Sequence, residues 1–151
     1  MSHVERPMRH RRVMATALAV LAMTMLAACS ASSSDPEALM NKTFTTQEVT
    51  IDGTKQALAL GSTLTLTFTA DGISAKADCN SMFGQVNLDG GSLQMETPLG
   101  MTMMACDPAL MEQDQWISDF LSSGPKWSLD GGILTLTFGG SAIELRDATS
   151  A

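Results

Sequence analysis

Residues 62–78, STLTLTFTADGISAKAD, show the alternation that points to a β fold. Apolar and polar residues alternate in two runs, and the residues Ala-Asp-Gly separate them. The apolar members are Leu64, Leu66 and Phe68 in the first run and Ile73, Ala75 and Ala77 in the second. Alternation with a period of two places one face of a strand in the core, and a glycine-containing turn between two such runs predicts a β-hairpin.

Two further segments have the same pattern. Residues 81–96 predict a pair of short strands around Asp89-Gly90-Gly91, and residues 131–147 predict a hairpin that turns at Gly139-Gly140. One helix interrupts the strands. Asp107 can cap it, Pro108 suits its first position, and Gly124-Pro125 ends it.

The predicted helix has an apolar stripe that should pack on the sheet. Its members are Leu110, Trp116, Ile117, Phe120 and Leu121, whereas Glu112, Gln113, Asp114 and Asp119 are expected to face solvent. We therefore expect a mainly β (α+β) fold, a small antiparallel, barrel-like sheet with one packed α-helix.

The first 28 residues have the features of a secretory signal peptide. Four arginines precede the apolar run VMATALAVLAMTMLAAC, and LAAC resembles the lipobox of bacterial lipoproteins, with Cys29 as the lipidated residue. The alternative is an ordinary signal peptide whose cysteine lies near the cleavage site by chance. We expect Sec export and a lipid anchor in the cell envelope, on the outer face of the cell membrane or in the outer membrane. Residues 29–39 should form a flexible tether and residues 40–147 one domain.

Processing before Cys29 would change the charge and remove both histidines. It takes four of nine basic residues and one of sixteen acidic residues, which leaves 5 − 15 = −10. Such a charge disfavours nucleic acid as a partner. Without His3 and His10 the domain cannot build a Ser-His-Asp, Cys-His or histidine-ligated zinc site. We expect no cofactor, and a monomer.

Residues 98–108, PLGMTMMACDP, raise the question of a soft-metal site. If they form a strand, Met104 and Cys106 share one face, while Met101 and Met103 share the other. Four sulfurs that do not converge would not bind Cu(I), so we expect no metal and methionines that fill gaps in the core.

Cys79 and Cys106 are the only thiols that remain once Cys29 carries lipid. Both fall on faces expected to point inward, in a chain exported to an oxidising compartment, where such a pair normally forms a disulfide. Two buried free thiols are the alternative.

These motifs resemble the META/HslJ domain. Its hallmark is a Cys-Asn pair followed by Thr-x-Met-Ala-Cys, a helix with an acid and a terminal hairpin. Cys79-Asn80 matches the first motif, and Thr102, Met104, Ala105 and Cys106 match the second; Glu112 is the expected helix acid. The resemblance covers residues 40–147. It departs from the family at Asp78, where glycine is usual, and at Phe44, where tryptophan is usual.

The resemblance implies a bacterial envelope protein, often a lipoprotein, associated with heat shock and novobiocin tolerance, and a small antiparallel β fold with a helix. It carries over no catalytic residue. We expect a non-enzymatic protein that binds a protein or a cell-wall component, with Asn80 fixing a turn through its own backbone. The alternative is a hydrolase of an envelope glycan that uses two carboxylates from Asp78, Glu96, Asp107 and Glu112.

Overall fold

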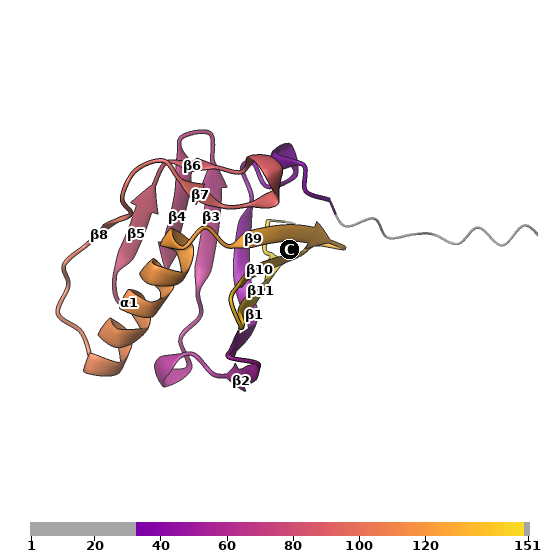
Figure 1. The fold of residues 1–151 in the computed structure, drawn as a ribbon. Coiled ribbons are helices and arrows are strands. Elements are labelled where there is room, and N and C mark those ends of the chain that lie inside the picture. The colour runs from indigo at the N-terminus through magenta and orange to yellow at the C-terminus, as the bar shows by residue number, and fades with distance from the viewer. Residues whose placement is uncertain (1–32, 150–151) are drawn as a thin grey trace, which may run out of the picture.

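The computed structural model describes residues 33–149, in which strands dominate and one α-helix, α1 (Pro108–Ser122), accompanies them (Figure 1). The described residues also form three short 3₁₀ turns: Pro36–Ala38 precedes β1, and Ala59–Gly61 and Asp89–Gly91 connect strands. The strands are β1 (Thr43–Ile51), β2 (Thr54–Gln56), β3 (Thr65–Thr69), β4 (Gly72–Lys76), β5 (Ser81–Gly84), β6 (Val86–Asn87), β7 (Gln94–Met95), β8 (Gly100–Met101), β9 (Lys126–Asp130), β10 (Ile133–Phe138) and β11 (Ser141–Asp147).

The main sheet is antiparallel and its strands follow the order β8-β5-β4-β3-β1-β11-β10-β9, with β2 paired to β1. Strands β6 and β7 form a separate two-stranded sheet. The prediction of a mainly antiparallel β fold with one helix is confirmed. The main sheet is open, with β8 and β9 at its two ends, so the term barrel-like applies only loosely.

The predicted hairpins form as the alternation requires. In β3–β4, Phe68 pairs with Ile73 and Leu66 with Ala75, and all four are buried. In β10–β11, Leu134 pairs with Leu145 and Leu136 with Ile143, again all buried. The inward faces of both hairpins belong to one continuous hydrophobic core.

Phe44 of β1 lies in the middle of this core. Its side chain is fully buried and meets the ring of Phe68 edge to face, with ring centroids 6.0 Å apart. A phenylalanine therefore fills the position at which the family resemblance led us to expect tryptophan.

Helix α1 begins and ends where the sequence predicts. The Asp107 carboxylate accepts a hydrogen bond from the Ala109 amide at 2.9 Å, Pro108 occupies the first helical position, and Gly124 follows with a φ of +72°. Ile117, Phe120 and Leu121 are buried as expected. The prediction that the polar residues Gln113 and Asp114 face solvent is wrong, because both are buried.

Part of the segment expected to be a flexible tether belongs to the domain. Ser33 pairs with Leu129 on the outer edge of β9, the residues Pro36–Ala38 form a 3₁₀ turn capped by the Asp35 carboxylate, and Leu39 is fully buried. The domain therefore includes residues 33–39, beyond the expected start at residue 40. The predicted signal peptide and Cys29 lie outside the described residues. Within residues 33–149, α1 is too short and too polar to cross a membrane.

Candidate functional site

The two sequence motifs meet at the β8 end of the sheet. Cys79 and Asn80 immediately precede β5, and residues 102–107 connect β8 to the start of α1. Strands β5 and β8 pair through Met82 and Met101, which brings the two segments side by side. This end of the sheet is therefore the candidate site.

The Asn80 side chain holds the 102–107 segment in place. It is 5% exposed, and its Oδ1 accepts hydrogen bonds from the Thr102 hydroxyl at 2.9 Å and from the Met104 amide at 2.8 Å. Its Nδ2 lies 3.2 Å from Cys79 Sγ, toward which it donates. We expected Asn80 to bond its own backbone; the structure instead shows it joining two segments that lie far apart in the sequence.

Thr102 completes the connection from the other side. Its hydroxyl donates to Asn80 and accepts from the Ser81 amide at 3.0 Å, and its own amide donates to the Ser81 carbonyl at 3.0 Å. The motif thus needs a hydroxyl that both donates and accepts, which explains the threonine.

Cys79 and Cys106 form a disulfide, with their Cα atoms 6.1 Å apart. Cys79 is buried as expected, whereas Cys106 is partly exposed, so the expectation that both point inward holds for Cys79 alone. The bridge fixes the far end of the 102–107 segment next to the residue that Asn80 already contacts.

Asp114 of α1 is the helix acid that contacts the motif. Its Oδ2 accepts the Asn80 amide at 2.8 Å, and the residue is 1% exposed. Its Oδ1 is also buried and has no hydrogen-bond partner within residues 33–149. The expected helix acid, Glu112, is exposed and lines a different hollow. A signal for Asp114 existed, since it lies four residues after Leu110 and three before Ile117, on the apolar stripe of the helix.

Gln113 makes a similar buried contact on the neighbouring face of α1. Its Oε1 accepts the Ala59 amide, and its Nε2 donates to the Ser62 hydroxyl at 2.8 Å. These bonds attach the β2–β3 connection to the helix. Two of the four helix residues that were expected to face solvent, Gln113 and Asp114, therefore link α1 to the rest of the domain.

Residues 102–107 form an irregular loop, so the prediction of a strand is wrong. The argument that the methionines alternate between two faces therefore fails. The expectation that methionines fill gaps in the core holds for Met101, which packs against it, and is wrong for Met103 and Met104. Met103 is 94% exposed, Met104 is 60% exposed, and Met111 on the first turn of α1 is 43% exposed. These three side chains, which we call the methionine platform, line a hollow of about 330 Å³ together with Asn80 and Asp114.

The remaining motif residues take ordinary positions. Ala105 is exposed in the loop, and Asp78 has a φ of +69°. That conformation suits the glycine usual in the family, and aspartate tolerates it better than most other residues. The departure at Asp78 therefore leaves the turn before Cys79 intact.

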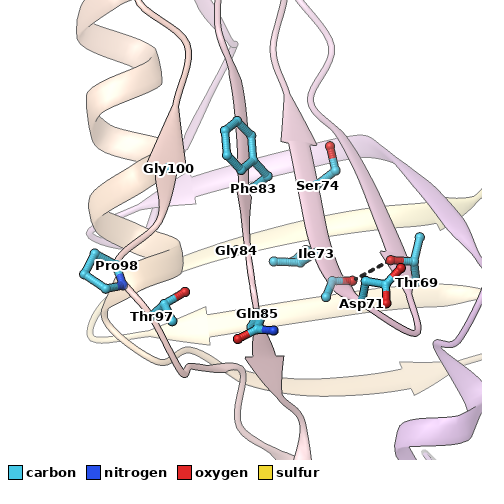
Figure 2. Close-up of a pocket in the computed structure, with 11 residues that line it drawn as sticks. Thr69, Asp71, Ile73, Ser74, Phe83, Gly84, Gln85, Thr97, Pro98 and Gly100 are labelled. Atoms are coloured by element: carbon cyan, nitrogen blue, oxygen red, sulfur yellow. Dashed lines mark hydrogen bonds between the residues drawn. The ribbon is translucent and has the colours of Figure 1, made fainter.

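Another hollow lies beside the β3–β4 turn and β5. It has a volume of about 450 Å³ and is bounded by β4, β5 and the β7–β8 connection, with Phe83, Ser74 and Asp71 on its walls (Figure 2). Glycine is required at Gly72, and Gly100 leaves room for the Phe83 ring. A β-carbon on Gly72 would come 2.1 Å from the Gly84 carbonyl oxygen, and one on Gly100 would come 2.7 Å from the Phe83 ring.

The carboxylates that could support hydrolysis do not pair within any hollow described above. Asp78, Glu96, Asp107 and Glu112 are all exposed, and Asp107 is engaged in capping α1. Each hollow described here, at the methionine platform, beside Glu112 and beside Phe83, has a single carboxylate on its wall. Within the part of the chain that the structure describes, no group of three or more histidine, cysteine or acidic residues could hold a metal ion.

Comparison with known proteins supports the resemblance seen in the motifs. The family model described as META domain matches residues 35–150. Two solved structures share the fold. An NMR structure of a protein is 25% identical, with a TM-score of 0.56, and the match covers 74% of this chain and 93% of that one. An NMR structure of a protein from Burkholderia xenovorans is 22% identical, with a TM-score of 0.61, and the match covers 75% and 86%. The search of curated proteins found no match.

Proposed function

This chain belongs to the META domain family, and from that premise we propose that it is a non-enzymatic envelope lipoprotein that binds another envelope protein. The binding surface is the methionine platform, Met103, Met104 and Met111. The observation that carries the proposal is the combination of exposed methionine side chains and a backbone held by Asn80 and the disulfide.

Exposed methionines at one place need an explanation, because methionine is among the residues most often buried. Methionine side chains are flexible and polarisable, and they suit surfaces that adapt to an apolar partner. A glycan would need hydrogen-bond donors and acceptors, which a thioether supplies only weakly. The platform therefore favours an apolar protein segment over a sugar.

The fixed backbone of the loop supports the same interpretation. Ordering a loop on binding costs free energy, and a loop that is already ordered avoids that cost. Asn80, Thr102 and the disulfide order the loop backbone, while the side chains of Met103 and Met104 remain exposed and adaptable. We infer that the motif residues hold the loop in a fixed geometry for binding and do not themselves carry out chemistry.

The charge of the domain gives the partner a further property. The processed chain would carry a net charge of −10, and Asp107 and Glu112 are exposed at the start of α1, as is Met111. Complementary potentials accelerate association and exclude wrong partners. The partner segment we propose is therefore apolar, with basic residues beside it.

The anchoring part of the proposal depends on the sequence of the first 29 residues. A Sec signal peptide ending in a lipobox would leave diacylglycerol on Cys29. Two acyl chains give stable membrane attachment, which a single chain does not. The protein would then act as a monomer in the cell envelope, in stress or antibiotic tolerance. The glycan hydrolase receives no support, because no hollow described above has two carboxylates on its wall.

Replacing Met103 and Met104 by serine should weaken capture of the partner. Burial of each methionine is worth about 1.5 kcal/mol, so the double variant should bind about 100-fold more weakly. Crosslinking in intact envelopes, followed by affinity purification, measures the loss. Phe138→Ser is the matched control, because Phe138 is 50% exposed and lies at the end of β10. Equal recovery of the partner by the double variant and the wild type would exclude the platform as the binding surface.

A further inference from the structure

The start of the described chain is held to one particular edge of the sheet. The Ser33 amide donates to the Leu129 carbonyl at 2.8 Å, and the Leu129 amide donates to the Ser33 carbonyl at 3.0 Å. This antiparallel pairing occupies the outer edge of β9 at Leu129, where backbone groups would otherwise be unpaired, and Ser92 pairs with Lys126 at the start of the same strand. Asp35 then caps a 3₁₀ turn, and Leu39 enters the core.

Only four peptide units separate Cys29 from Ser33. Even a fully extended chain spans at most about 3.6 Å per residue, so the two Cα atoms can be no more than about 14 Å apart. A lipid on Cys29 would therefore keep Ser33, and the β9 edge paired with it, within that distance of the membrane surface.

The methionine platform lies at the other end of the molecule. Strand β9 and the chain leaving toward residue 33 are at one side of Figure 1, and β8 and the loop that follows it are at the opposite side. A compact domain of this length is about 35 Å across. With a short connection to Cys29, the domain has an anchored end at Ser33 and β9 and a free end at the methionine platform.

We infer that the β9 edge is the membrane-proximal surface of this protein and that the methionine platform points away from the membrane that carries the lipid. The inference rests on the anchoring at Cys29 in the proposed function. The net charge of −10 acts in the same direction, because an anionic lipid surface repels a domain that would lie flat on it. The partner is then a protein that contacts the side of the domain farthest from the membrane that carries the lipid.

The orientation can be measured on vesicles without relying on lipidation by the cell. The processed chain, beginning at Cys29, is coupled through the Cys29 thiol to a maleimide phospholipid, since Cys79 and Cys106 are bridged. All core residues lie within residues 39–145, so this chain contains the whole core. In a Trp116→Phe, Trp127→Phe background, Asp130→Trp places one donor beside Leu129, and Met103→Trp places one in the platform.

Energy transfer to dansyl headgroups, which falls steeply with distance, should be strong from position 130 and weak from position 103. Inserting twelve glycine and serine residues between positions 32 and 33 adds about 20 Å of root-mean-square reach and should reduce transfer from position 130. Circular dichroism of each variant confirms the fold. Equal transfer from the two positions, or more transfer from position 103, would overturn the orientation.

The anchoring itself is tested separately by the mass of the protein isolated from membranes. A chain that begins at Cys29 with diacylglycerol supports both the proposed function and the inference. A chain that begins at another residue would overturn the anchoring, and the orientation in the cell with it, whatever the vesicle result.

Discussion

Removing the Cys79–Cys106 disulfide is expected to lower the free energy of unfolding by about 3.6 kcal/mol. The two cysteines are 27 positions apart, so the bridge closes a loop of about 28 residues, whose entropy in the unfolded chain it reduces. For a domain of this size the midpoint of thermal unfolding should fall by about 15 °C. The Cys79→Ala, Cys106→Ala double variant, followed by circular dichroism, measures this change.

The β-rich spectrum should survive in the double variant, because the core lies in the strands and α1 and not at the bridge. Treating the wild type with a reductant should give the same shift, and the reductant should leave the double variant unchanged. A shift below about 1 kcal/mol would mean that the unfolded chain is already compact around the bridge, and that loop entropy is the wrong explanation.

Replacing Asn80 by alanine is expected to lower the free energy of unfolding by about 2 to 3 kcal/mol. The change removes the oxygen that accepts from Thr102 and Met104, so the Met104 amide and the Thr102 hydroxyl lose their acceptor, while the Asn80 backbone amide can still donate to Asp114. Urea denaturation of the oxidised protein measures the loss, and amide exchange at Met104 should increase as the loop loosens.

Asn87→Ala is the matched control for this prediction. Asn87 is half-exposed and its side chain makes one local bond, accepting from the Asp89 amide at 2.7 Å. Its replacement should cost less than about 1 kcal/mol. Equal costs at the two positions would show that Asn80 acts only as a local turn residue, as the sequence alone suggested.

The strands and the helix were predictable because their signals are local. Alternation in residues 64–68 and 134–138 decides which side chains face the core, and the Asp107-Pro108 pair decides where the helix begins. Packing of these elements agrees with the local preferences, so the hairpins and α1 lie where the sequence places them.

The loop at residues 102–107 was not predictable by the same method. Methionine and alanine are apolar on any hydropathy scale, and a run of them reads as a buried strand. The backbone is instead directed by Asn80 and the disulfide, which come from a part of the chain more than twenty residues away. A contact of that kind leaves no periodic signal.

Asp114 and Ser33 were missed for a different reason. In a chain with sixteen acidic residues, any one acid is expected at the surface. The burial of Asp114 could be predicted only from its helical position, which places it on the apolar stripe. The small polar residues around Ser33 have the composition of a linker, yet their backbone pairs with the free edge of β9. Backbone pairing of this kind depends little on side chains.

We propose above all that the methionine platform binds a protein. Incorporating a photoreactive methionine analogue at position 103 and irradiating intact envelopes tests it most directly, with the same analogue at position 138 as the reference. We expect one discrete protein adduct from position 103 and none of the same mass from position 138. Adducts to cell-wall glycan at position 103, or no adduct that differs from position 138, would contradict it.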